Sequence, residues 1–281
     1  MRRLYWLPVV VLAVLGVSCS SDNEYVQAEP EMVVCRFGFT AYDVEGMTRA
    51  ETSISSVVSR LDVWVEDGNG GRTAVHQTNS DSEFGSLTMT LDKTKTYTVT
   101  AVGHKAGGEA TLTNGVIAFP EEKVTHSMVY RTTFSPSTTT ELSCSMSRIV
   151  GMFRMTTTDA VPDEVVKMVF ELGESPTRWN VAGYGVNAVE RTSTFSSISR
   201  KADGSASFSV YVISSADEAT EHTITVTALD SEDEVVQQRV FEDVPIRNGY
   251  RTSYEGSFFI DTPMSMAFTV GDWSEYETVE F

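Results

Sequence analysis

Apolar and polar residues alternate at every second position through most of the chain after residue 31, and this pattern constrains the fold most strongly. Such alternation is typical of β-strands with one buried and one solvated face, a surface that Thr and Val suit well. The apolar members of the clearest runs, predicted to lie in a core, are Leu61, Val63, Val65, Val99 and Ala101. The residues that alternate with them, including Asp62, Trp64 and Glu66, are predicted to face solvent. The chain is therefore expected to be all-β.

A pattern of strands occurs twice along the chain. Residues 95–102, Lys-Thr-Tyr-Thr-Val-Thr-Ala-Val, have a near twin in residues 222–229, His-Thr-Ile-Thr-Val-Thr-Ala-Leu. The repeat predicts two β-sandwiches of one kind, over residues 32–145 and 146–281. The second core is expected to contain Val226 and Ala228, with Val169 or its neighbours Met168 and Phe170. The stretch Thr177–Lys201 is rich in Gly, Ser and Asn and is predicted to be a surface loop.

The start of the chain has the pattern of an export signal. Two arginines precede an apolar run over residues 4–17, which is too short to span a bilayer comfortably. The run ends in Gly16-Val17-Ser18 before Cys19, which resembles a bacterial lipobox, although Gly16 stands where a leucine is usual. Residues 1–18 are therefore predicted to be a signal peptide, Cys19 a lipidation site, and residues 19–31 an acidic tether. A plain secretory signal is the alternative.

The charge balance excludes some partners. The chain has 281 residues with 39 acidic and 21 basic side chains, so its formal net charge is -18. Nucleic acid and anionic lipid both require a basic surface, so neither is an expected partner. The charge instead favours solubility of an exported protein.

Cys35 and Cys144 remain once Cys19 is assigned to lipid. Outside the cytoplasm they could form a disulfide. Two buried thiols that act as small apolar side chains are the alternative. Neither cysteine lies in a Cys-x-x-Cys pair or a Cys/His cluster, so no zinc site is expected.

The residue patterns of common catalytic and metal sites are missing from the sequence. None of the four histidines, at positions 76, 104, 126 and 222, has metal-ligand spacing to another, and each is predicted to lie on the surface. No enzyme activity, metal or cofactor is expected. Trp179 and Tyr184 are candidate exposed aromatics for binding a sugar or a partner, with ordinary packing of the loop as the alternative.

Several short motifs occur in an order that resembles the fimbrillin superfamily, the subunits of type V pili of Gram-negative anaerobes. A lipoprotein signal precedes a strand at Val34–Ala41, then Gly-Met-Thr-Arg-Ala at residues 46–50 and Leu-Asp-Val-Trp-Val at residues 61–65. Val-Pro-Ile-Arg-Asn-Gly-Tyr follows at residues 244–250, and Asp272-Trp273 comes late. The resemblance implies two tandem transthyretin-like β-sandwiches and a lipoprotein of the outer membrane or a fimbria, acting in cell adhesion.

The resemblance also implies a maturation site. Arg49 and Ala50 match the place where an arginine-specific protease removes the first strand of polymerising subunits. A sandwich that lacks an edge strand exposes unpaired backbone groups and an apolar cleft, which a strand of another subunit can fill. The expected partners are other fimbrillin-like subunits, the outer membrane through lipid on Cys19, and a host or bacterial surface ligand. An exposed-loop arginine without such a role is the alternative for Arg49.

The sequence therefore leaves two alternative hypotheses for the function. The first is a pilus subunit, pilus anchor or adhesin that assembles by strand exchange. The second is a surface glycan-binding β-sandwich lipoprotein. A removable first strand ending near Arg49 favours the first function, and aromatic platforms in loops favour the second.

Overall fold

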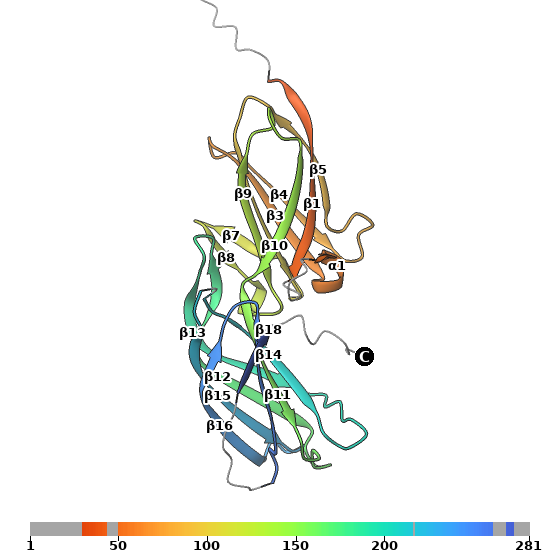
Figure 1. Ribbon diagram of the computed structural model, residues 1–281, viewed down its shortest axis with the longest axis vertical. Helices are drawn as coiled ribbons and strands as arrows, with labels where there is room; N and C mark the ends of the chain where they lie inside the picture. The colour runs from red at the N-terminus through yellow and green to blue at the C-terminus, as the bar shows by residue number, and fades with distance from the viewer. Residues whose placement is uncertain (1–29, 44–49, 216, 261–267, 273–281) are drawn as a thin grey trace, which may run out of the picture. The chain divides into compact units, whose positions relative to one another are not determined.

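The computed structural model describes residues 30–43, 50–215, 217–260 and 268–272, and it is nearly all-β with three sheets (Figure 1). Among these residues the helical elements are a four-residue helix, α1 (Ile54–Val57), and a three-residue 3-10 helix, η1 (Pro120–Glu122). No helix in the described part of the chain has the length and apolar character needed to cross a membrane. The all-β class predicted from the alternation is confirmed.

The first sheet has the strand order β2-β1-β10-β9-β6-β3-β4, with β5 paired to β1. Its strands are β1 (Met32–Asp43), β2 (Ala50–Ser53), β3 (Arg60–Asp67), β4 (Arg72–Thr78), β5 (Ser86–Asp92), β6 (Tyr97–His104), β9 (Met128–Phe134) and β10 (Glu141–Arg148). Strands β10 and β9 pair at two positions near the end of β10. This short contact joins the layer of β2, β1, β5 and β10 to the layer of β9, β6, β3 and β4.

Two further sheets contain the remaining strands. The four-stranded sheet has the order β14-β11-β17-β18, and the six-stranded sheet has the order β16-β15-β12-β8-β7 with β13 paired to β12. Their strands are β7 (Thr111–Thr113), β8 (Val116–Ala118), β11 (Val150–Thr157), β12 (Lys167–Asn180), β13 (Tyr184–Phe195), β14 (Ser207–Ile213), β15 (Thr220–Leu229), β16 (Val235–Ile246), β17 (Tyr250–Gly256) and β18 (Thr269–Asp272).

The same pairing pattern occurs in both halves of the chain. Strand β1 pairs antiparallel with β5 and parallel with β10, and β11 likewise pairs antiparallel with β14 and parallel with β17. Strand β3 lies between β4 and β6, and β12 lies between β13 and β15. The twin sequences at residues 95–102 and 222–229 lie in the equivalent strands β6 and β15. The sequence repeat therefore reflects a repeat of strand pairing.

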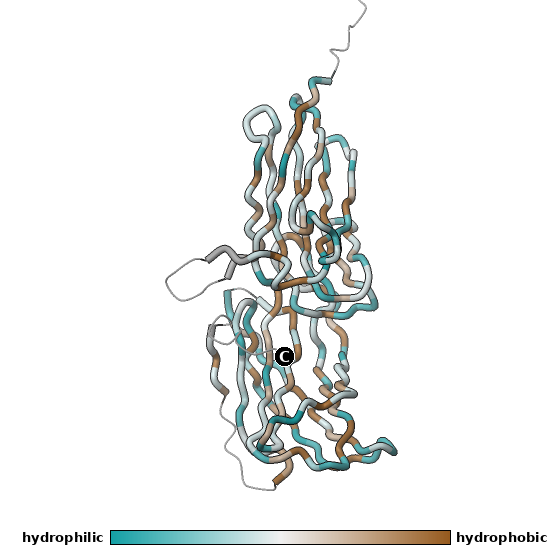
Figure 2. Tube along the Cα trace, turned by 90° about the vertical axis from the view of Figure 1, so that its right-hand side faces the viewer, coloured by the Kyte–Doolittle hydropathy of each residue, from teal (hydrophilic) through white to brown (hydrophobic). Residues whose placement is uncertain are grey.

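Two core clusters confirm the predicted inward faces. All five residues predicted for the first core are at most 3% exposed and belong to a cluster drawn from residues 35–146. Met168, Phe170, Val226 and Ala228 are fully buried in a second cluster drawn from residues 153–258. In Figure 2 the strands change between hydrophobic and hydrophilic colours along their length, as this alternation requires.

A third cluster overturns the predicted solvated face of β3. Trp64 is 3% exposed and Asp62 is fully buried, because the β7–β8 hairpin packs over this side of the sheet. The cluster combines Trp64 and Val102 of the first sheet with Ile117 of the hairpin and Trp179 of β12. Strand β8 also pairs with β12, so the hairpin connects the first half of the chain to the six-stranded sheet (Figure 1). Both faces of β3 are thus buried.

Burial of Asp62 is compensated by hydrogen bonds. One carboxylate oxygen lies 2.7 Å from Nδ1 of His76, and the other lies 2.8 Å from Nε2 of His104 and accepts the Ala110 N–H at 2.8 Å. Burial raises the pKa of Asp62, but the hydrogen bonds from His104, Ala110 and His76 outweigh it, so the pKa lies below its usual value. His104 is fully buried, so its predicted surface position is wrong, whereas His76 is exposed as predicted.

His126 is the second buried histidine, and its predicted surface position is also wrong. Its ring is 4% exposed and stacks on Tyr211 with 5.9 Å between ring centroids. Its Nε2 accepts a hydrogen bond of 2.9 Å from Nε of Arg148. Burial, followed by the charges of Arg148 and Lys105, holds the pKa of His126 well below its usual value of 6.5. The His126 ring is therefore neutral in the folded protein at neutral pH.

Neutral His126 predicts a loss of stability in mild acid. Below about pH 6.5 the unfolded chain binds a proton at this ring and the folded chain does not, so the free energy of unfolding falls as the pH is lowered. The expected loss approaches about 1.4 kcal/mol for each pH unit below 6.5. Urea unfolding at pH 7.5 and pH 5.5 measures it. His126→Gln, whose amide oxygen can accept the Arg148 bond, is expected to flatten this dependence.

A second histidine, His222, also contributes to the pH dependence of stability. His222 also has a pKa lowered by burial and by Arg191, so part of the slope survives in His126→Gln. His222→Gln and the double variant separate the two contributions. An unchanged slope in His126→Gln would show that the buried ring does not couple folding to pH.

The predicted loop at residues 177–201 is largely a regular hairpin. Strands β12 and β13 pair from Met168↔Phe195 to Asn180↔Tyr184, with a register shift between Leu172 and Ser175. The polar composition misled the prediction because β13 is an edge strand of this sheet, where many of its side chains are exposed. Such a strand needs little apolar sequence of its own.

Candidate strand-exchange site

Strand β1 has hydrogen-bonded neighbours on both sides. It pairs antiparallel with β5 over Met32–Gly38 and with β2 over Thr40–Asp43 on one side. On the other side it pairs parallel with β10 over Arg36–Ala41. β1 is therefore an internal strand, whereas the sequence analysis treated the removable strand as an edge strand. Its loss would leave unpaired backbone groups on strands at both sides of the gap.

The inward face of β1 is as the alternation predicts. Cys35, Phe37, Phe39 and Ala41 are each at most 4% exposed and belong to the first core cluster. The Phe37 ring meets the Phe134 ring of β9 edge to face, with 5.5 Å between centroids. Burial of side chains of this size contributes about 1.5–3 kcal/mol each for the phenylalanines. The gap left by β1 would thus be apolar as well as unpaired.

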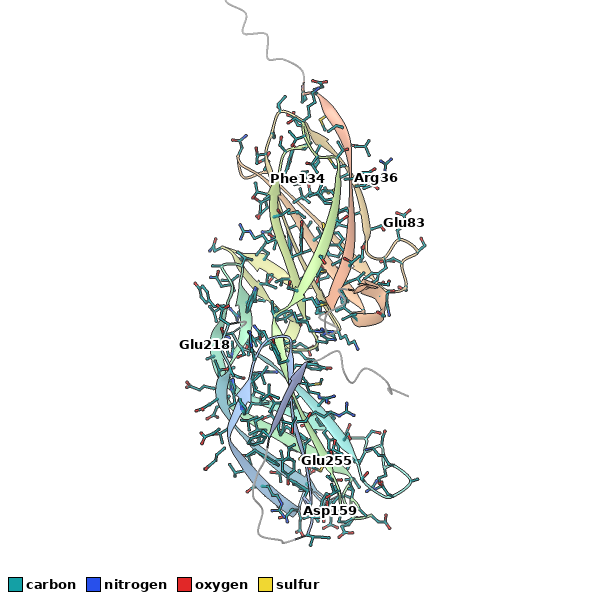
Figure 3. All side chains as sticks on the ribbon, in the orientation of Figure 1. Arg36, Glu83, Phe134, Asp159, Glu218 and Glu255 are labelled. Atoms are coloured by element: carbon teal, nitrogen blue, oxygen red, sulfur yellow. The ribbon has the colours of Figure 1, made fainter. Side chains whose placement is uncertain are left out.

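The outward face of β1 has a different character. Val34 is 43% exposed, and Arg36 forms an exposed ion pair of 3.6 Å with Glu141 of β10. Arg36 is labelled on β1 and Phe134 on β9 in Figure 3. An exposed ion pair of this kind contributes at most about 1 kcal/mol. The strand is held mainly by its inward side chains and its backbone bonds.

Strand β1 is joined to the rest of the fold through a single short connection. Residues 44–49 link β1 to β2, and Ala50 is the first residue of β2, paired with Asp43. Arg49 lies outside the described residues. Cleavage between Arg49 and Ala50 would separate β1 covalently from β2 while leaving every other described strand in one chain.

Cys35 and Cys144 are buried free thiols, which is the second of the two alternatives. In the parallel register of β1 and β10, Cys144 pairs with Phe39, four residues beyond Cys35. At about 3.3 Å per residue this offset is about 13 Å, and a disulfide requires Cα atoms within about 7 Å. Burial raises the pKa of the Cys144 thiol to about 12. Both thiols therefore act as apolar packing.

The C-terminal strand lies at an edge of the four-stranded sheet. Strand β18 pairs antiparallel with β17, from Ser253↔Thr269 to Tyr250↔Asp272. Phe268 packs partly buried against the second core cluster, while Val270 is 47% exposed. The residues before Phe268 in the alternating run, 264–267, lie outside the described residues. A four-residue edge strand has few contacts to hold it in place.

A buried carboxylate fixes the chain just before this segment. Asp159, at the lower end of Figure 3, is 8% exposed and accepts backbone N–H bonds of 2.7–3.1 Å from Phe258, Phe259 and Ile260. Hydrogen bonds to a charged group contribute more than neutral ones. Asp159 therefore holds the backbone of residues 258–260 in place.

Comparison with known proteins places this fold. A scan against protein-family models finds no match, and a search of curated proteins finds none either. A candidate cell adhesion protein from Bacteroides ovatus aligns over 86% of this chain and 98% of its own, with a TM-score of 0.52 and 14% identity. A candidate polysaccharide-binding protein from Bacteroides thetaiotaomicron aligns over 85% and 96%, with a TM-score of 0.53 and 11% identity. The chain has the fold of these proteins.

The solved structures also include a fimbrial protein. The fimbrial anchor protein Mfa2 from Porphyromonas gingivalis aligns over 85% of this chain and 97% of its own, with a TM-score of 0.47 and 11% identity. At these identities the likeness to the cell adhesion and polysaccharide-binding candidates is one of fold.

Of the remaining predicted site residues, Trp179 and Tyr184 lie in the described part of the chain, at the same end of the β12–β13 hairpin. Cys19 lies outside the described residues. Trp179 is 6% exposed within the third core cluster, so its prediction as an exposed aromatic is wrong. It is buried because β8 pairs with this end of β12, at Ile117↔Trp179. Tyr184, at the start of β13, is 53% exposed as predicted. The polar network around Asp62 was missed, since no spacing in the sequence relates Asp62 to His104.

Proposed function

We propose that this chain is a fimbrillin-like cell-surface lipoprotein that assembles with similar subunits by strand exchange. The proposal rests on the position of β1 in the fold. This strand has four inward side chains and hydrogen-bonded neighbours on both sides, but its covalent link to the strands that follow is the short segment 44–49. The fold shared with a candidate cell adhesion protein supports a role at the surface. The role is structural and adhesive and needs no catalysis.

The geometry of the gap defines what can replace β1. An incoming strand must run parallel to β10 and antiparallel to β5, and must present apolar side chains at alternate positions. Residues 264–270, Met-Ser-Met-Ala-Phe-Thr-Val, have this alternation, with Met266, Phe268 and Val270 on one face. A neighbouring copy of this chain, or a related subunit with such a segment, can therefore fill the groove.

The domain organisation belongs to the same proposal. Residues 32–145 and 146–281 form two tandem transthyretin-like sandwiches after a signal peptide over residues 1–18 and a tether over residues 19–31. The repeated pairing pattern and the two large core clusters support two sandwiches, and the pairing of Ser147 and Arg148 with β9 favours a boundary at the end of β10. The β7–β8 hairpin, which pairs with β12, then serves as the link that braces one sandwich against the other.

Anchorage in the outer membrane is proposed to depend on Cys19. Each buried methylene of an acyl chain contributes about 0.8 kcal/mol, so several chains on one cysteine hold firmly. In a Gram-negative host, Cys19→Ser is expected to abolish incorporation of labelled fatty acid and to release the protein from the membrane fraction. Persistent membrane association of Cys19→Ser would contradict the lipid anchor.

A glycan-binding surface lipoprotein is the second candidate function. It is favoured by the fold shared with a candidate polysaccharide-binding protein and by the exposed ring of Tyr184. The position of the gene separates the two: neighbouring fimbrillin-like lipoproteins favour assembly, and neighbouring outer-membrane sugar transporters favour glycan capture.

The assembly proposal has a direct test on native material. Polymers built by strand exchange are expected to resist SDS at room temperature and to dissociate on heating, because the inserted strand is held by a full set of backbone bonds and buried side chains. Electrophoresis of unheated surface extracts should then show a ladder that collapses to one band after boiling. A single band in both samples would contradict polymerisation.

A further inference from the structure

A polar cavity lies between the outer face of the first sheet and the turn of the β7–β8 hairpin. Its volume is about 330 Å³, at the lower end of the range of about 300–1,000 Å³ found for small-molecule sites. Its lining residues are Glu66, Arg72, Leu112, Thr113, Asn114, Gly115 and Arg131. The cavity is separate from β1 and from the C-terminal segment.

The walls of this cavity are fixed by Arg72. Its guanidinium donates a 2.7 Å hydrogen bond to the carbonyl of Leu112, which holds the hairpin on the sheet. It also lies 3.7 Å from the Glu66 carboxylate and 5.6 Å from the centre of the Trp64 ring. The turn itself takes positive φ at Asn114 (49°) and Gly115 (74°), as a tight hairpin requires. The cavity is thus preformed.

Arg131 differs from Arg72 in having no such bonds. It stands on β9 opposite Thr100 of β6, and Thr100 is opposite Trp64 of β3, so its side chain shares the face that the hairpin covers. It is exposed, and none of the described residues forms an ion pair or hydrogen bond with its guanidinium. In a chain of net charge -18, a free guanidinium at the wall of a preformed cavity is a ready site for an anion.

The rest of the lining narrows the class of ligand. Arg72 and Glu66 offset each other, which leaves one positive charge from Arg131. The Glu66 carboxylate, the Thr113 hydroxyl and the Asn114 amide offer acceptors and donors for hydroxyl groups. A phosphate would bring two charges close to Glu66, whereas a hydroxylated ring with one carboxylate matches both the charge and the polar groups.

From this arrangement we propose that the cavity binds an acidic sugar residue through its carboxylate. The planar guanidinium of Arg131 takes the carboxylate in two parallel hydrogen bonds, and Glu66, Thr113 and Asn114 contact the ring hydroxyls. The site goes beyond assembly by strand exchange and does not depend on it. It would give a surface protein selectivity for uronic-acid-containing glycans over neutral ones.

Calorimetric titration of the purified full chain with glucuronate, its methyl ester, glucose and inorganic phosphate tests the proposal. Glucuronate is expected to bind at least tenfold more tightly than the uncharged ester and glucose, and more tightly than phosphate. Arg131→Ala should weaken glucuronate binding at least tenfold, and Arg131→Lys, which keeps the charge but not the fork, should weaken it less. Arg154→Ala, a strand arginine of β11 outside the cavity, is the matched control and should bind as the unmodified chain does.

The outcomes are decisive in both directions. Absence of glucuronate binding, equal binding of the ester, or unchanged binding by Arg131→Ala would overturn the proposal. Tighter binding of phosphate would show a simple anion site and would overturn it as well. Circular dichroism confirms that the variants fold, and the oligomeric state after Arg49 cleavage, measured on the same preparations, tests assembly separately.

Discussion

Cleavage after Arg49 is expected to convert a monomeric preparation of this protein into linear oligomers. The cut leaves β1 attached to the body by its backbone bonds to β5, β2 and β10 and by its inward side chains, with no covalent link. A C-terminal segment of a neighbouring copy can then compete for the same groove. Light scattering coupled to size-exclusion chromatography follows the change in mass, and Arg49→Ala should prevent it under the same protease treatment.

Two substitutions in β18 distinguish strand exchange from nonspecific association. Val270 is exposed in its own chain, so Val270→Asp should leave the monomer folded but place a charge in an apolar pocket of the partner. Thr269→Asp, on the opposite face of the same strand, is the matched control and should still allow oligomers. Equal behaviour of the two variants would contradict insertion of this strand. Deletion of the residues after Pro263 is expected to abolish oligomers altogether.

Phe37→Ala is expected to lower the free energy of unfolding by about 3–5 kcal/mol. The Phe37 ring is 1% exposed and packs against Phe134, so its removal leaves a cavity in the first core cluster. Val34→Ala, on the outward face of the same strand, is the control and should cost about 0.5 kcal/mol, since Val34 is 43% exposed. Urea unfolding measures both variants. Similar losses would show that the inward side chains do not hold β1.

The inward faces of the strands were predictable because one side of each sheet carries a regular apolar pattern. Leu61, Val63 and Val65 illustrate this, as do Cys35 and Phe37. The outer face of β3 was not predictable in the same way. Asp62 and Trp64 alternate with the core residues and read as solvated, yet the β7–β8 hairpin covers them. Alternation within one strand cannot report a layer supplied by a segment about 50 residues away.

Pairing across the sheet was also beyond the sequence pattern. Alternation at β1 indicated a strand, but its parallel pairing with β10 depends on residues 141–146, over 100 positions later. The polar composition around residues 184–195 indicated a loop, although an edge strand such as β13 can be polar. The same holds for the candidate strand-exchange site: the inward side chains of β1 were predictable, but the position of β1 between β5 and β10 was not.

Competition by a free peptide tests directly whether β1 is a replaceable strand. Protein cut after Arg49 is incubated with an excess of a synthetic peptide of residues 31–43, or of a scrambled peptide of the same composition, and its mass is measured by light scattering. We expect the native peptide to keep the protein monomeric and the scrambled peptide to leave the oligomers unchanged. Oligomers that form equally with both peptides, or a cut protein that stays monomeric with its own β1 bound in the absence of peptide, would contradict it.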